Sequence, residues 1–129
     1  MEAEKLSESV VTLLIVDDEP LMTELFHKAM TKRGFRVLKA AGGAEALAIV
    51  PTETVDMVIT DLSMPVMDGT ALAHALYALA PLLPVLIATG HDVDATQLDL
   101  PHNVIGIIRK PYQHKVLEEQ IHDILAPDI

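Results

Sequence analysis

The chain has 129 residues, of which 19 are acidic and 9 basic, so its formal net charge is −10. A chain of this length most often forms one domain. Half of its residues are hydrophobic, which excludes a disordered acidic tail. A surface of this charge would repel phosphates, so we expect no direct binding of nucleic acid. The sequence has no cysteine, which excludes disulfides, thiolate metal sites and cysteine nucleophiles.

The sequence does not predict a membrane-inserted or secreted protein. No apolar run reaches the roughly 18–20 residues that a membrane span requires. The N-terminus lacks the basic start and apolar core of a signal peptide. We therefore expect a soluble cytoplasmic protein, with residues 1–10 as a polar lead-in and residues 11–129 as one domain.

Five short apolar runs are typical of β-strands. Four of them are apolar over most of their length, as expected of strands that are buried on both faces of a parallel sheet. The runs are Val11–Val16, Arg36–Leu38, Val55–Thr60, Pro84–Ala88 and Val104–Ile108.

Helical periodicity occupies most segments between these runs. Three apolar stripes predict helices that pack one face on the core. The stripes are Met22, Leu25, Phe26, Ala29 and Met30; Leu72, Leu76 and Leu79; and Leu117, Ile121, Ile124 and Leu125. A shorter helix is predicted at Ala44–Ala48, before Pro51. Asp92–Leu100 favours a helix only weakly, because few apolar residues align and Pro101 follows. This alternation predicts a three-layer α/β domain with a parallel sheet.

Polar side chains end four of the five predicted strands. Asp17 and Asp18 follow the first strand, Asp61 the third, Thr89 the fourth and Lys110 the fifth. In open α/β sheets, ligands gather beyond the carboxyl ends of the strands, where the strand order reverses. If the first and third strands are neighbours, three carboxylates, a hydroxyl and an ammonium meet at one edge of the sheet.

Each of these residues also has a purely structural interpretation. Asp17 or Asp18 would cap the following helix, Thr89 would be a capping hydroxyl, and Lys110 would be a solvated strand end. Asp68 is interpreted as a turn and helix start, and for it we favour this interpretation. For the others, capping alone does not readily explain polar residues at four strand ends on one edge, which favours a shared site.

Three clustered carboxylates repel one another and require a cation. Oxygen ligands without His or Cys suit Mg²⁺, with Mn²⁺ as the alternative. A metal there can neutralise a phosphoryl group while a carboxylate attacks phosphorus and becomes an acyl phosphate. Asp61, alone at its strand end, is the predicted nucleophile, and Asp17 and Asp18 are the predicted metal ligands. Lys110 and Thr89 are predicted to contact phosphoryl oxygens.

The ordered set of motifs resembles the receiver domain of two-component response regulators. The motifs are Asp17-Asp18, Asp61 with Met64-Pro65 and Met67-Asp68-Gly69 after it, Thr89, and Lys110-Pro111. The resemblance runs from about Val11 to Ala126 and implies a flavodoxin-like (βα)5 receiver fold with strand order 2-1-3-4-5.

This resemblance also implies a function and its partners. Asp61 would accept phosphate from a phosphohistidine on a sensor histidine kinase or a histidine phosphotransfer protein, changing contacts with an unidentified downstream protein. Asp18, Asp61 and the backbone carbonyl of Ser63 would bind Mg²⁺ directly, and Asp17 largely through a bound water. Lys110 and Thr89 match the lysine and the switch hydroxyl that contact the phosphoryl group.

Some positions depart from the family's usual pattern or border its site. The family usually has an aromatic residue three positions before Lys110, whose rotamer reports phosphorylation, but this chain has Ile107. We therefore expect the coupling from Thr89 to an output surface to differ. Tyr112 matches the aromatic residue often found after the Lys-Pro pair and is not expected to replace that movement. His91 is predicted to affect how readily water reaches the acyl phosphate, or else to be an exposed loop histidine.

Two other functions are weighed against a phosphorylatable receiver. One is an interaction module of the same fold that works without phosphorylation. The other is a phosphatase with an aspartyl nucleophile, of the haloacid dehalogenase type. Such enzymes place a second Asp two residues after the nucleophile, where this chain has Ser63. We therefore expect a signalling receiver and not an enzyme, either free-standing or belonging to a hybrid histidine kinase.

Overall fold

The chain folds as a five-stranded sheet covered by helices, as seen in a computed structural model that describes residues 10–125. The strands are β1 (Thr12–Val16), β2 (Arg36–Ala40), β3 (Met57–Asp61), β4 (Val85–Thr89) and β5 (Val104–Arg109). The helices are α2 (Pro20–Lys32), α3 (Gly43–Ile49), α4 (Gly69–Leu79) and α5 (His114–Leu125), with a 3-10 turn, η1 (Ala95–Gln97). All strands are parallel, in the order β2-β1-β3-β4-β5. The predicted flavodoxin-like fold and strand order are confirmed.

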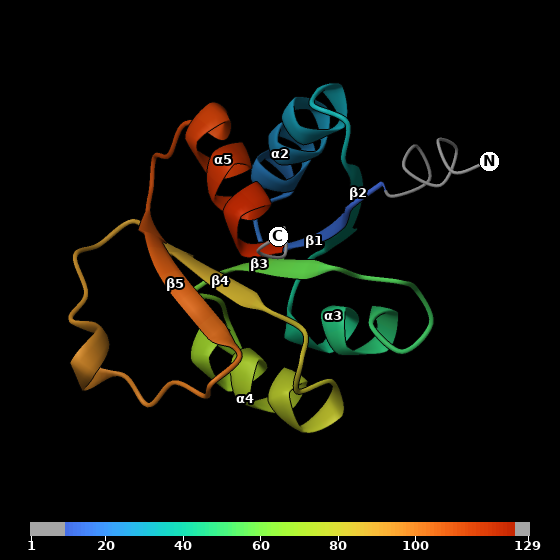
Figure 1. Cartoon of the computed structure of the whole chain (residues 1–129). Helices are drawn as coiled ribbons and strands as arrows, with labels where there is room; N and C mark the ends of the chain where they lie inside the picture. Colours follow the sequence, from blue (N-terminus) through green and yellow to red (C-terminus); the bar gives the residue numbers. More distant parts are fainter. Residues whose placement is uncertain (1–9, 126–129) are drawn as a thin grey trace.

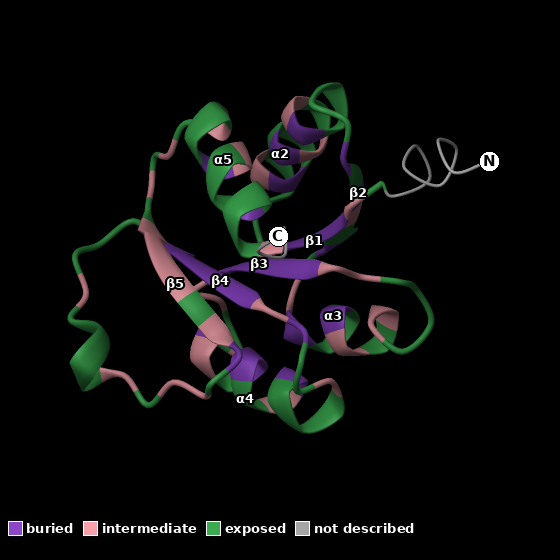
Figure 2. Cartoon of the chain, viewed as in Figure 1, coloured by how far each residue is buried: buried purple, intermediate pink, exposed green. Residues whose placement is uncertain are grey.

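The continuous apolar runs form the centre of the sheet. Every residue of β1 and β4 is buried, as are the first four of β3, which Figure 2 shows as purple arrows. The edge strand β2 mixes buried, half-buried and exposed residues, and the edge strand β5 has only half-buried and exposed ones. Burial on both faces therefore explains why the central runs contain so few polar side chains.

Helices cover both faces of the sheet and produce two apolar layers (Figure 1). On one face, Phe26 and Met30 of α2 and Leu117 and Ile121 of α5 pack against β1 and β3. On the other face, α3 and α4 form the second cluster, which includes Leu72 and its neighbours. Asp17, Asp61 and Lys110 stand at the carboxyl ends of β1, β3 and β5, between these layers.

The predicted helical stripes are wider than the faces that the helices bury. Leu25, Leu79 and Ile124 are exposed, at 49%, 48% and 36% of their surface. The prediction that whole stripes face the core is therefore wrong at these positions. Each helix contacts the sheet along a narrow line, so residues at the margin of a stripe remain in solvent.

Helix α2 ends in a glycine turn that directs the chain into β2. Gly34 has a positive φ of 96°, and its N–H donates to the Thr31 carbonyl at 3.0 Å. The Phe35 N–H donates to the Met30 carbonyl at 3.1 Å, which completes a Schellman motif. Phe35 and Met30 are both buried in the same core cluster, so the turn also fixes how α2 packs.

The connection between β4 and β5 contains no α-helix, only η1. The Asp94 side chain accepts from the Thr96 N–H at 3.0 Å and supports this single turn. The weakly predicted helix over Asp92–Leu100 is thus reduced to three residues, because polar residues dominate the segment and few apolar ones anchor it. The fold has four α-helices within residues 10–125, and η1 stands away from the sheet beside β5 (Figure 1).

Candidate functional site

Strand register brings the three predicted carboxylates together. β1 pairs directly with β3, with Val16 opposite Thr60, so the residues that follow lie side by side. Carboxylate oxygens of Asp17, Asp18 and Asp61 lie within 4.8 Å of one another. Asp17 is buried, Asp61 is half-buried and Asp18 is exposed. We call these three residues the acidic edge.

Lys110 inserts an ammonium into the acidic edge. Its Nζ lies 3.1 Å from Asp61 Oδ1 and 3.2 Å from Asp17 Oδ2. The backbone supports this position, because the Lys110 N–H donates to the Thr89 carbonyl at 2.7 Å and continues the β4–β5 pairing. One ammonium among three carboxylates leaves an excess of negative charge, which favours a further cation.

Burial and pairing act together on the ionisation of Asp61 and Lys110. Burial raises the pKa of Asp61, and the hydrogen bond and charge of Lys110 offset only part of that effect. Burial alone would lower the pKa of Lys110, but its contacts with Asp61 and Asp17 outweigh burial and raise it. Lys110 therefore stays positively charged, and Asp61 is more easily protonated than a free aspartate.

Three carboxylates in mutual reach fit a hard divalent cation. Mg²⁺ prefers carboxylate oxygens with retained waters, and neither His nor Cys is needed. Asp18 is exposed enough to keep water in such a site, while Asp17 is held in place by the Glu19 N–H, which donates to its Oδ1 at 3.0 Å. The donor set at this edge of the sheet is therefore chemically suited to Mg²⁺.

Thr89 ends β4, next to Ala88, which is the partner of Asp61 in the β3–β4 pairing, and it is 2% exposed. Its Oγ1 accepts a hydrogen bond from the His91 N–H at 3.1 Å, which ties Thr89 to the loop after β4. A hydroxyl that accepts one bond keeps its O–H for a second acceptor. The His91 side chain is exposed on this loop.

The loop from Leu62 to Asp68 folds back tightly on the end of β3. Asp68 caps α4, because its side chain accepts from the Ala71 N–H at 2.8 Å, which confirms the structural interpretation of that residue. The Gly69 N–H donates to the Leu62 carbonyl at 2.8 Å. A Cβ at Gly69 would come within 2.5 Å of the Asp61 carbonyl oxygen. The loop, which carries the exposed Ser63, is thus closely fitted around Asp61.

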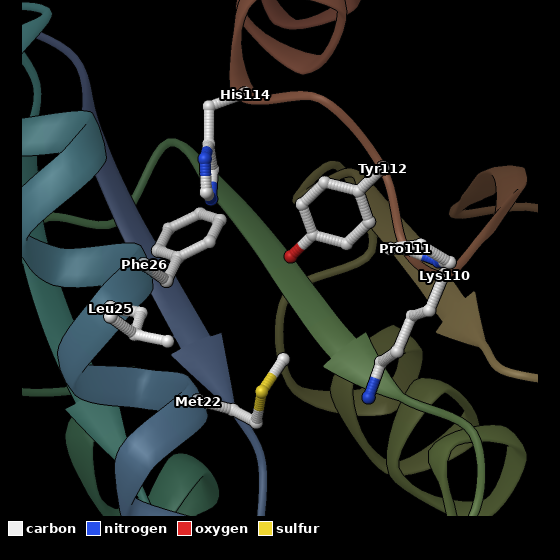
Figure 3. A pocket seen from close by; sticks show the side chains of 7 residues that line it. All are labelled: Met22, Leu25, Phe26, Lys110, Pro111, Tyr112 and His114. Carbon is white, nitrogen blue, oxygen red and sulfur yellow. The ribbon is translucent and has the colours of Figure 1, made fainter.

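A mostly apolar cavity of about 400 Å³ adjoins Lys110 on the side of α2 (Figure 3). Its walls come from α2 and from the segment between β5 and α5. The lining residues are Met22, Leu25, Phe26, Lys110, Pro111, Tyr112 and His114. Sequence reasoning treated Met22 and Phe26 as core and gave His114 no role. Nothing in the periodicity marks such a cavity, because its walls belong to separate elements.

The comparison with known families agrees with the geometry. The model of the response regulator receiver domain matches residues 13–122. This chain belongs to the response regulator receiver domain family. Receiver domains occur in response regulators and in hybrid histidine kinases, and both kinds of protein are among its relatives.

Two curated relatives and one solved structure illustrate this receiver domain's similarity. It is 37% identical over 118 residues to the transcriptional regulatory protein GlrR of Escherichia coli, covering 88% of this chain and 26% of GlrR. It is 34% identical over 117 residues to the sensor kinase CckA of Brucella abortus, covering 88% of this chain and 12% of CckA. The response regulator TrrA from Thermotoga maritima, in complex with Mg²⁺–BeF, superposes with a TM-score of 0.79 at 25% identity, covering 90% of this chain and all of TrrA.

The receiver domain spans about a quarter of GlrR and an eighth of CckA. The activities of those whole proteins therefore do not transfer to it directly. None of the helices within residues 10–125 has the length and apolar character needed to cross a membrane.

Proposed function

We propose that this receiver domain is the phosphoacceptor of a two-component phosphorelay, over residues 11–129. Asp61 takes a phosphoryl group from a phosphohistidine on a sensor histidine kinase or a histidine phosphotransfer protein. The proposal rests on one observation above all, the 3.1 Å contact of Lys110 Nζ with Asp61 Oδ1 within the acidic edge. Phosphorylation changes contacts with a downstream protein. The similarity to a regulator and to a sensor kinase supports either a free-standing or a hybrid-kinase setting.

The transfer forms one bond and breaks one. A carboxylate oxygen of Asp61 attacks phosphorus, the P–N bond to the donor histidine breaks, and the imidazole nitrogen leaves and takes up a proton. Lys110, already beside Asp61, pairs with a phosphoryl oxygen, and the Thr89 hydroxyl donates to another. The attacking group must be ionised, so the ammonium of Lys110 supports the reaction by opposing the burial that raises the pKa of Asp61.

Asp17, Asp18 and Asp61, with the backbone carbonyl of Ser63, would hold Mg²⁺, or Mn²⁺ in its place. A cation bound there supplies neutralisation of phosphoryl charge. The Mg²⁺–BeF complex of TrrA supports this assignment by similarity. We propose a signalling role without turnover of an external substrate, with His91 affecting how readily water reaches the acyl phosphate.

The first experiment is incubation with Mg²⁺ and acetyl phosphate, followed by intact-mass measurement. The wild type should gain one phosphate, and Asp61→Asn should gain none. Asp68→Asn is the matched control, since it removes a carboxylate from the same loop but keeps a capping oxygen for the Ala71 N–H. It should be phosphorylated like the wild type. Chelation of the metal with EDTA should abolish the adduct in the wild type and in Asp68→Asn.

The opposite result has a definite meaning. If the wild type gains no phosphate with several small donors and partner kinases, the phosphoacceptor proposal is wrong. The chain would then act as an interaction module of the same fold that works without phosphorylation, which is the alternative that Ile107 leaves open.

A further inference from the structure

Aromatic side chains are scarce in this chain. It has two tyrosines, two phenylalanines and no tryptophan. Phe26 and Phe35 are buried and carry no polar group. Tyr77, on α4, is 40% exposed and packs on His102 at a ring distance of 6.5 Å. Tyr112 is the tyrosine that follows Lys110 closely and lines the cavity beside the acidic edge.

Near Thr89, strand β5 carries an aliphatic side chain, that of Ile107. The half-buried Ile107 lines a cavity of about 190 Å³ together with Thr89, His91 and Ala95. An aliphatic side chain has neither a donor nor an acceptor with which to follow a change in the Thr89 hydroxyl. If the hydrogen bonding of the Thr89 hydroxyl changes, the side chain of Ile107 therefore cannot follow it through a hydrogen bond.

Tyr112 points the other way, into the cavity between β5 and α2. Figure 3 shows its hydroxyl directed at the middle of the cavity, with Phe26 and Met22 across from it and the Lys110 ammonium at the lower end. The cavity measures about 400 Å³, and one wall is Met22, a flexible side chain. The ring therefore has room to change its tilt without displacing a strand.

The charges of the acidic edge reach this hydroxyl. Burial, followed by the negative charges of Asp17 and Asp61, raises the pKa of Tyr112 to about 12. The hydroxyl thus remains protonated and is a hydrogen-bond donor under all ordinary conditions. Phosphorylation of Asp61 would add negative charge to a residue whose charge already acts on the Tyr112 hydroxyl. A neutral donor in a partly buried site is drawn toward added negative charge.

Movement of the Tyr112 ring would alter the packing of side chains on two helices, α2 and α5. The ring packs edge-on against His114 at 5.8 Å, and His114 packs edge-on against Phe26 at 6.2 Å. His114 is the first residue of α5, and Phe26 is buried in α2. Leu25, which also lines the cavity, is 49% exposed on the outer surface of α2. A tilt of one ring therefore changes the surface formed by Met22, Leu25, Tyr112 and His114 over the buried Phe26, which we call the α2–α5 surface.

We propose that Tyr112, contrary to the expectation from the sequence, is the aromatic residue that reports phosphorylation of Asp61 in this chain, and that the change is presented on the α2–α5 surface. This proposal rests on the proposed function, because it requires a phosphoryl group on Asp61. Tyr112 is a positioning residue here and does not take part in the transfer itself.

The absence of tryptophan makes tyrosine emission a direct test. Tyr77→Phe leaves Tyr112 as the sole tyrosine, and Tyr112→Phe leaves Tyr77. Each protein is brought to saturating Mg²⁺, its emission is recorded, acetyl phosphate is added, and emission and intact mass are measured on the same sample. The Tyr77→Phe protein should change its emission as the phosphate adduct forms. This change should be lost in Tyr77→Phe/Asp61→Asn, and the Tyr112→Phe protein should show none.

The outcomes separate the two proposals. An adduct without any emission change in Tyr77→Phe overturns the role of Tyr112, and so does a change confined to Tyr112→Phe. No adduct in any protein overturns the proposed function and the reporter with it. The decisive measurement uses Tyr77→Phe, which removes only one hydroxyl from a partly exposed ring, so it does not depend on the folding of Tyr112→Phe.

Discussion

At Asp61, burial and ion pairing act on one carboxyl in opposite directions. Its side chain is 13% exposed, and the Lys110 ammonium lies 3.1 Å away. Burial is the larger influence, so the pKa of Asp61 is raised from its ordinary value of 3.8. A raised folded-state pKa means that ionisation of Asp61 opposes folding. This penalty is absent well below pH 3.8 and complete once the pH exceeds the folded-state pKa.

Asp61→Asn should therefore stabilise the protein in the absence of divalent cations. We expect a higher melting temperature than wild type at neutral pH, and a difference that closes as the pH falls below the ordinary value of 3.8. Thermal unfolding followed by circular dichroism across this pH range measures it. Asp68→Asn, which removes an exposed carboxyl but keeps a capping oxygen, is the control measured beside it. An Asp61→Asn protein that is less stable at neutral pH would contradict this account.

Among the elements, the β3–α4 loop determines how closely the backbone surrounds Asp61. Gly69 begins α4 and is buried against Asp61 and Leu62. A Cβ there would lie 2.5 Å from the Asp61 carbonyl oxygen and 3.0 Å from Leu62 Cα, and backbone atoms cannot swing aside as a side chain can. The loop must therefore move if any larger residue replaces Gly69.

Gly69→Ala should cost about 1–3 kcal/mol of stability through overpacking and should also slow phosphorylation of Asp61. Gly42→Ala is the control, because a Cβ there meets nothing within 4 Å and its φ of −178° is extended. Its cost should stay within about 1 kcal/mol, as a weaker helix cap. Urea denaturation and the rate of adduct formation measure both effects. Equal losses in the two variants would show that the loop is not closely fitted.

The elements also show which features can be predicted from sequence. Runs such as Leu13–Val16 and Val85–Ala88 identify central strands, because burial on both faces leaves no place for polar residues. The segment over Asp92–Leu100 was harder to predict, since whether a turn extends to a helix depends on neighbours that supply apolar contacts. Exposure of Leu25 likewise depends on how α2 sits on the sheet, which periodicity does not specify.

At the scale of the whole molecule, the parallel topology allows the functional site to be predicted from the residues that end the strands, because all carboxyl ends lie at one edge of the sheet. Asp17, Asp61, Thr89 and Lys110 are scattered along the sequence, yet the strand order places them at one edge. The net charge of −10 matters less than this local excess of carboxylates, which only one lysine offsets. The direction of Tyr112, in contrast, follows from how α2 and the start of α5 face each other, and no motif indicates it.

The most direct test of the central claim locates the phosphate within the chain. The protein is phosphorylated with acetyl phosphate and Mg²⁺, digested, and its peptides are fragmented by mass spectrometry under conditions that preserve acyl phosphates. We predict one modified position, Asp61, among 19 acidic residues and six histidines. A phosphate on a histidine, or on a carboxylate outside the acidic edge, would contradict the account.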